Sequence, residues 1–105
     1  MKRYEGIRHE RSGEVLVDGV PLNVRFDLRK HSPTGFEWGY HGSGPAQLAL
    51  ALLADCVGDD LAVTLYQEFK RRVVANLPED HWTLTSEEIE QTVRAILREV
   101  EEGVT

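Results

Sequence analysis

A glycine-rich segment carries the residue types that most strongly suggest chemistry. Gly42, Ser43 and Gly44 stand directly before a run that is typical of a helix. At such a strand-to-helix turn, backbone N–H groups and the positive end of the helix converge on an anion such as a phosphate or carboxylate. With His41 and Gln47 on either side, the segment is a candidate small-ligand or anion site, and the place where an enzyme would work.

The same turn departs from known catalytic loops. A Walker loop ends in Gly-Lys-Ser or Gly-Lys-Thr, which is absent here, and Pro45 removes a backbone donor. A nucleophile elbow around Ser43 needs glycine at positions 41 and 45, where His41 and Pro45 stand. The pattern favours a structural turn into a buried helix over a ligand site. We assign no catalytic residue and lean towards a non-enzymatic protein.

The histidines and the single cysteine do not predict a metal centre. The four histidines have no short ligand spacing to one another or to Cys56, and zinc ligands usually show such spacing. Cys56 follows an apolar run and has no cationic neighbour, so we expect a small core residue and not a reactive thiolate. We predict neither a metal nor a cofactor.

Three aromatic rings alternate after a turn expected at residues 32–35. Phe36, Trp38 and Tyr40 fall on one face of a predicted strand. Such a face could stack the bases of single-stranded nucleic acid. Large aromatic side chains more often supply core volume, which is the interpretation we favour. Nucleic-acid binding through this strand is kept as an alternative.

Further strands are expected in the first part of the chain. Asp18-Gly19 is typical of a type I′ hairpin turn and sets Val17 opposite Val20. Strict alternation from Leu22 to Leu28 predicts a half-buried strand. Residues 4–9 add another strand. Together with the aromatic segment this gives an antiparallel sheet of three to four strands within the first 40 residues.

Two helices are predicted after the sheet. Pro45 suits the first position of a helix. Residues 47–56 follow it with apolar side chains on nearly every side, so this should be the central, buried helix. Gly58 ends it, and Asp59 or Asp60 is expected to cap a second helix.

A third helix has the clearest start signal. Thr85 and Glu88 match a capping box, and an apolar stripe follows at helical spacing. The stripe consists of Ile89, Val93, Ile96, Leu97 and Val100. The predicted fold is therefore α+β, an antiparallel sheet followed by three helices, in a single domain over residues 1–105.

Charge is distributed unevenly along the chain. The net charge is -6 from 12 basic and 18 acidic residues, and residues 77–105 carry two of the basic and eight of the acidic ones. Glu99, Glu101 and Glu102 lie at the helix end where the dipole disfavours acid. They are candidate partner-binding residues, set either against residues 70–72 (Lys-Arg-Arg) inside the fold or against a basic partner outside it.

Composition also bears on location and on nucleic acid. One cysteine gives no sign of an oxidising compartment, and the longest apolar stretch is far below the ~20 residues that span a bilayer. We expect a cytoplasmic protein without membrane contact. A net acidic chain argues against general nucleic-acid binding.

Residues 32–53, with the sequence SPTGFEWGYHGSGPAQLALALL, carry a family resemblance. Together with YQEFK at 66–70 and WTLT at 82–85, they resemble an uncharacterised bacterial and phage family, a domain of unknown function. The resemblance covers the chain from about residue 4 to residue 97. It implies a prokaryotic, phage or mobile-element context, but no activity, ligand or catalytic residue.

These observations favour one function over two alternatives. We expect a small non-enzymatic interaction or accessory protein with an unknown protein partner. A homodimer through the amphipathic last helix, or through an edge strand marked by Pro21, is one form of such an interaction. The alternatives are ligand binding at residues 40–47 and single-stranded nucleic-acid binding at residues 36–40.

Overall fold

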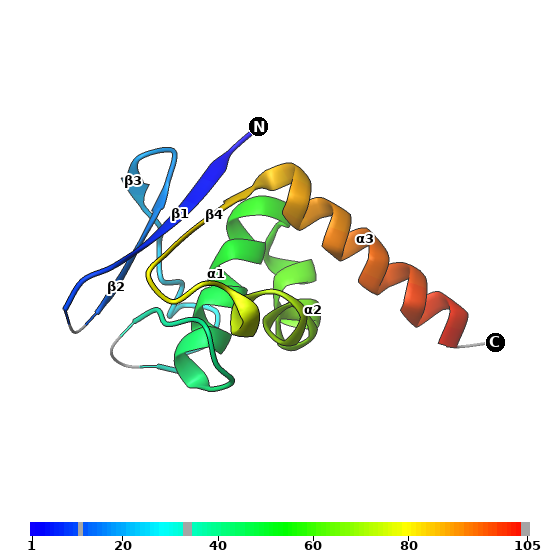
Figure 1. The fold of residues 1–105 in the computed structure, drawn as a ribbon. Helices are drawn as coiled ribbons and strands as arrows, with labels where there is room; N and C mark the ends of the chain where they lie inside the picture. The colour runs from blue at the N-terminus through cyan, green and yellow to red at the C-terminus, as the bar shows by residue number, and fades with distance from the viewer. Residues whose placement is uncertain (11, 33–34, 104–105) are drawn as a thin grey trace.

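The computed structural model describes residues 1–10, 12–32 and 35–103, which Figure 1 traces. Along these residues the elements are β1 (Arg3–Arg8), β2 (Gly13–Val17), β3 (Val20–Pro21), α1 (Ser43–Val57), α2 (Asp59–Arg72), the 3₁₀ helix η1 (Val74–Asn76), β4 (His81–Thr85) and α3 (Ser86–Gly103). The strands form an antiparallel sheet in the order β3-β2-β1-β4. The predicted α+β class, with a small antiparallel sheet and three helices in this part of the chain, is confirmed.

The β2–β3 hairpin follows from its two turn residues. Asp18 has a φ of 49° and Gly19 a φ of 82°, the two positive values that a type I′ turn requires. Val17 pairs with Val20, as predicted. Local chemistry alone is enough to place this hairpin.

The strand predicted over residues 22–28 does not form. Arg25 has a φ of 57°, which is a left-handed and not an extended conformation. Its N–H donates to Asn23 Oδ1 at 2.9 Å, and the carbonyl of Val24 accepts a hydrogen bond from Gln47 Nε2 at 2.7 Å. The N–H of Leu22 still donates to the carbonyl of Val15 in β2 at 3.0 Å, but after Leu22 side chains bind this backbone, so the strand prediction was wrong.

The fourth strand is β4, and residues 36–40 have no regular structure. The N–H of Gly39 donates to the carbonyl of Val74 at 3.0 Å, and the indole N–H of Trp38 donates to the carbonyls of Pro78 and Glu79 at 3.0 and 3.1 Å. The aromatic-strand prediction was wrong because this segment binds the chain that follows α2. The turn predicted just before it includes residues 33 and 34, which lie outside the described residues.

Helix α1 is buried along most of its length, as predicted for the central helix. Every residue from 44 to 54 is buried. The helix begins at Ser43, so Pro45 stands third and not first. That position still lies in the first turn, where an N–H has no partner within the helix, so the missing donor of Pro45 leaves no helix bond unmade.

Gly58 alone separates α1 from α2. Its φ of 96° lies in the region that glycine enters without a steric penalty. The predicted cap by Asp59 or Asp60 was wrong, because Gly58 is the N-cap residue and has no side chain with which to cap the helix. Asp59 instead forms an ion pair with Arg25 at 2.9 Å. Both aspartates still occupy the first turn, where the helix dipole favours acid.

The predicted capping box at the start of α3 is confirmed. The N–H of Glu88 donates to Thr85 Oγ1 at 3.2 Å, and the N–H of Thr85 donates to Glu88 Oε1 at 2.9 Å. The same residue, Thr85, ends β4, so the strand passes directly into the helix.

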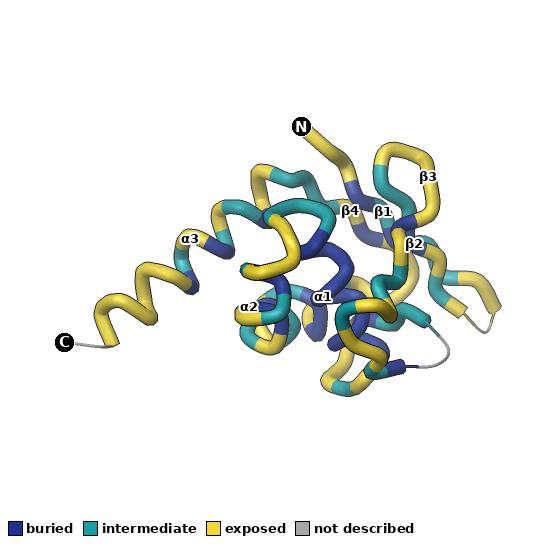
Figure 2. Tube along the Cα trace, turned by 180° about the vertical axis from the view of Figure 1, so that it is seen from behind, coloured by how far each residue is buried: buried dark blue, intermediate teal, exposed yellow. Residues whose placement is uncertain are grey.

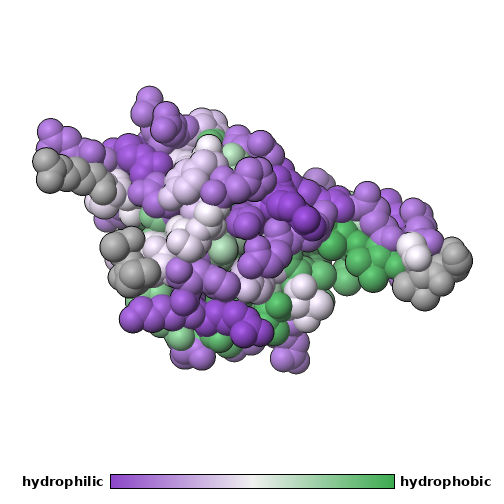
Figure 3. Space-filling model, turned by 90° about the horizontal axis from the view of Figure 1, so that it is seen from below, coloured by the Kyte–Doolittle hydropathy of each residue, from purple (hydrophilic) through white to green (hydrophobic). Residues whose placement is uncertain are grey.

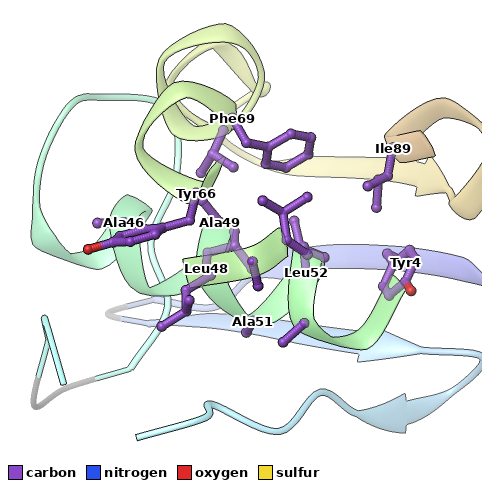
Figure 4. Packing of buried hydrophobic residues seen from close by; sticks show 14 of the residues in the cluster. Tyr4, Ala46, Leu48, Ala49, Ala51, Leu52, Tyr66, Phe69 and Ile89 are labelled. Atoms are coloured by element: carbon purple, nitrogen blue, oxygen red, sulfur yellow. The ribbon is translucent and has the colours of Figure 1, made fainter. Parts of the chain in front are cut away.

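The hydrophobic core lies between the sheet and the helices, with α1 at its centre (Figure 4). Tyr4, Val15 and Trp82 come from three strands and are buried together with the apolar side chains of α1, α2 and the first half of α3. Burial ends before α3 does. Figures 1 and 2 show the last turns of this helix projecting from the body, with exposed residues around them. The molecule measures 47 × 27 × 24 Å.

Among the described helices, none combines the length and the apolar character needed to cross a membrane.

Candidate functional site

The five residues predicted as a ligand site at the glycine-rich turn do not share one environment. His41 and Ser43 are exposed, Gly42 is half-buried, and Gly44 and Gln47 are buried. Gly42 is the N-cap residue of α1 and makes no side-chain cap bond. His41 and Ser43 therefore face solvent, whereas the amide of Gln47, which was expected to share a site with them, is buried.

Gln47 has a structural role that uses its whole side chain. Its Oε1 accepts the N–H of His31 at 2.7 Å and that of Ser32 at 3.4 Å. Its Nε2 donates to the carbonyl of Val24 at 2.7 Å and to that of Arg29 at 3.0 Å. Both amide donors are therefore occupied, and Gln47 fastens the loop after β3 to α1. The signal for this role is a single amide within an otherwise apolar helix.

Two glycines, Gly44 of the turn and Gly13 at the start of β2, make room for neighbouring side chains. A Cβ at Gly44 would lie 2.6 Å from Cβ of Glu37, and a Cβ at Gly13 would lie 2.4 Å from the ring of Trp38. Glu37 in turn pairs with Arg8 at 2.5 Å, and the Arg8 guanidinium stands 4.3 Å from the Trp38 ring centre. The glycine and aromatic pattern thus builds a packed corner around Trp38.

The three rings of residues 36–40 do not form one face. Trp38 is only 1% exposed and packs edge-on against Trp82, with ring centres 5.6 Å apart. Phe36 is half-buried, and Tyr40 is 50% exposed. Trp38 therefore has the core role that the sequence favoured, and the described residues offer no stacking platform made of all three rings.

A polar cluster that the sequence did not predict lies where β1 meets the end of α1. Tyr4 Oη donates to Asp55 Oδ2 at 2.8 Å, and Lys2 Nζ pairs with the same oxygen at 3.2 Å. Burial, and then the hydrogen bond to Asp55, raises the pKa of the Tyr4 phenol well above its usual value. Burial also raises the pKa of Cys56. Both groups keep their protons at neutral pH, so this cluster stabilises structure and offers no nucleophile.

Three of the histidines contact different partners. His31 Nε2 contacts the Tyr66 hydroxyl at 2.7 Å, whereas His9 and His81 contact glutamates on the sheet at 3.0 and 2.9 Å. Within residues 1–10, 12–32 and 35–103, no group of three or more His, Cys, Asp or Glu side chains could hold a metal ion.

The three candidate glutamates of α3 have different surroundings. Glu99 forms an ion pair with Arg72 of α2, which matches the expectation of a basic group inside the fold. Arg72 also pairs with Glu68 at 3.1 Å. Glu101 lies one turn from Leu97 at the edge of an exposed hollow, and Glu102 is exposed. Charge compensation within the fold therefore involves Glu99, while Glu101 lines an open surface.

Leu97 and Val100 form an exposed seam on the projecting end of α3. They are 39% and 56% exposed, although Ile96 beside them is 2% exposed. Figure 3 shows hydrophobic surface along this side of the helix, bordered by hydrophilic surface. The core stripe of α3 therefore continues past the point where the rest of the molecule covers it.

The seam lies between two hollows. One, of about 340 Å³, runs between α2 and α3, and its lining includes Leu65, Ile96 and Val100. The other, of about 460 Å³, lies on the open side of α3 and is lined by Arg94, Leu97, Arg98, Val100 and Glu101. Val100 lines both hollows. The end of α3 therefore exposes apolar side chains with charged side chains next to them. Sequence reasoning recognised the amphipathic helix but could not tell where its burial stops.

Comparison with known proteins places the chain in a family without assigning it a role. Residues 4–95 match the family of unknown function DUF6166. No curated protein and no solved structure matches the chain. The matched range includes the packed corner around Trp38 and ends before Leu97. The predicted resemblance to a family of unknown function is thereby confirmed: the chain belongs to DUF6166.

Proposed function

We propose that this protein is a small non-enzymatic interaction protein that binds a protein partner through the end of α3, residues 96–103. The observation that carries the proposal is the exposed seam, Leu97 and Val100, on a helix end that projects from the body. While they are exposed to water, these two side chains contribute little stabilisation. A partner that covers them removes apolar surface from solvent, which is favourable. The seam is small, which fits a transient or modest interaction.

The charged groups beside the seam support a specific partner over unselective sticking. Arg94, Arg98 and Glu101 line the open side of the helix around Leu97. Charges at the rim of an apolar contact select orientation and partner more than they add affinity. A basic group on a partner would meet Glu101, in line with the expectation drawn from the acidic end of the chain.

The polar groups elsewhere in the described chain support a non-enzymatic role. Gln47 already binds four backbone groups, and the Tyr4 phenol is engaged by Asp55. The raised pKa of Tyr4 and of Cys56 disfavours their use as nucleophiles at neutral pH. Ligand binding at residues 40–47 and single-stranded nucleic-acid binding at residues 36–40 remain predictions for which we find no supporting contact.

The expected location and origin of the protein come from its sequence. We expect a cytoplasmic protein of bacterial, phage or mobile-element origin, because the composition and the family resemblance point there. A homodimer is one way to cover the seam.

A site-specific photo-crosslinker tests the proposal. The full chain is made with Val100→p-benzoylphenylalanine, and a matched control carries Ser43→p-benzoylphenylalanine at the exposed start of α1. We expect the probe at position 100 to form a protein crosslink that Leu97→Asp abolishes, and the probe at position 43 to form none. Crosslinks at position 43 together with none at position 100 would move the function to the glycine-rich turn and overturn the proposal.

A further inference from the structure

The charges next to the exposed seam repeat at a spacing that suits a second copy of the same helix. Arg94 and Glu101 are seven residues apart, which is about two turns or roughly 10 Å along the axis. They stand on the same side of α3 and flank Leu97 in the hollow that it lines. Within the described part of the chain neither Arg94 nor Glu101 makes an ion pair.

Seven-residue spacing gives these positions a defined meaning in helix pairing. With Leu97 and Val100 as the seam, Arg94 and Glu101 occupy the same heptad position beside it. In an antiparallel pair, the flank of one helix faces the same flank of its partner. A basic and an acidic residue at equivalent positions of one flank can therefore satisfy each other across a two-fold axis.

We propose that the end of α3 pairs with α3 of a second copy in antiparallel orientation, with Arg94 of each copy opposite Glu101 of the other. This inference rests on the proposed function and names its partner. The two-fold axis passes between residues 97 and 98, so the two Leu97 side chains meet near the centre. Each Val100 then packs beside the aliphatic stem of the other copy's Arg94.

The shape of the molecule leaves room for this pairing. The last turns of α3 extend beyond the body, so a second helix can lie along them without meeting the sheet (Figures 1 and 2). Antiparallel pairing places the two bodies at opposite ends of the contact. Glu99 remains with Arg72 on the side facing α2, so it does not compete for Arg94. A second copy of α3 therefore already carries the complementary charges at the matching positions, whereas an unrelated partner would need its own acidic and basic groups there.

Charge exchange across the axis gives a sharp test in the full chain. Sedimentation velocity is run over a range of protein concentrations for wild type, Arg94→Glu and Glu101→Arg. Each single variant places like charges opposite each other twice, so we expect dimerisation to weaken at least tenfold. An equimolar mixture of the two variants restores both attractions and should sediment as a heterodimer. The double variant Arg94→Glu/Glu101→Arg should recover the homodimer.

Glu10→Arg is the matched control, because it makes the same charge change as Glu101→Arg but lies between β1 and β2, strands that Figure 1 shows on the opposite side of the molecule from the end of α3. It should dimerise like wild type. Circular dichroism checks that each variant is folded. Recovery in the mixture is a result that a folding defect could not produce.

Three results would overturn the pairing. They are a wild-type monomer at every concentration, single variants that dimerise like wild type, or a mixture that stays monomeric. If wild type is monomeric but the probe at position 100 still crosslinks a different protein, only the pairing fails and the proposed function stands. If that probe also crosslinks nothing, both fail.

Discussion

The glycine-rich corner at residues 36–47 and the end of α3 differ in how well their sequences indicate a binding surface. The corner has the residue types that suggest chemistry, yet the Gln47 amide, the Trp38 ring and the glycines make contacts within the fold. The end of α3 has an ordinary amphipathic pattern, yet its Leu97 and Val100 are 39% and 56% exposed. An unusual motif is therefore not by itself a functional site. A common amphipathic pattern that continues beyond the buried part of its helix indicates a binding surface.

The largest expected effect separates the two regions by stability. Trp38→Ala removes a buried ring from the corner and should cost about 3–5 kcal/mol of the free energy of unfolding. Leu97→Ala removes exposed surface and should change it by less than about 1 kcal/mol. Urea unfolding of dilute protein measures both. Equal losses for the two variants would contradict the contrast.

The role of Gln47 sharpens the description of the corner. Gln47→Leu keeps the apolar bulk but leaves four backbone groups without their side-chain partner, so we expect a loss of at least about 2 kcal/mol. Gln67→Leu, on the exposed face of α2, is the matched control and should be nearly neutral. Thermal or urea unfolding gives the answer. A neutral Gln47→Leu would show that the loop after β3 does not depend on this residue.

The Tyr4 phenol predicts an alkaline weakening of the body. Its pKa is raised in the folded state, mainly by burial and next by the hydrogen bond to Asp55. The folded protein therefore holds the proton where the unfolded chain, with an ordinary pKa of about 10, loses it. The free energy of unfolding must then fall as the pH rises above that value.

Unfolding of wild type and Tyr4→Phe across an alkaline pH series tests this. The variant has no phenol to ionise, so its decline should be shallower. The pKa of the Cys56 thiol is raised too and depends in part on Tyr4, so both proteins are also compared with Cys56→Ala added, which removes the thiol from the comparison. Parallel declines would exclude Tyr4 as the source.

The smallest expected effect concerns the ion pair that joins α2 to α3. Glu99→Gln removes the Arg72 contact at the surface, so we expect only a slight loss of stability, which salt screening reduces further. Glu101→Gln should leave the stability of dilute protein unchanged. A larger effect for Glu101 than for Glu99, in unfolding at low salt, would reverse the assignment of the two residues.

Sequence reasoning succeeded where the deciding contacts are local. The hairpin turn at Asp18-Gly19 and the capping box of Thr85 and Glu88 each depend on residues within four positions of one another. Local contacts of this kind leave a signal that a single sequence carries.

It failed where distant residues decide. Alternation after Leu22 predicted a strand, but Gln47, more than 20 positions away, binds that backbone. The aromatic segment was expected to pair in the sheet, but Trp38 binds carbonyls about 40 positions later. The candidate site shows the same limit. The apolar stripe of α3 could be read from the sequence, whereas the point at which it leaves the core depends on how α3 lies against α2, which is a long-range contact.

Hydrogen exchange of the full chain at low and high protein concentration tests the central claim most directly, because it observes both regions in one experiment. We predict that amides of the last turns of α3, residues 96–103, exchange more slowly at high concentration, while amides of residues 36–47 exchange at the same rate throughout. Protection gained by residues 36–47, with none in α3, would contradict the account.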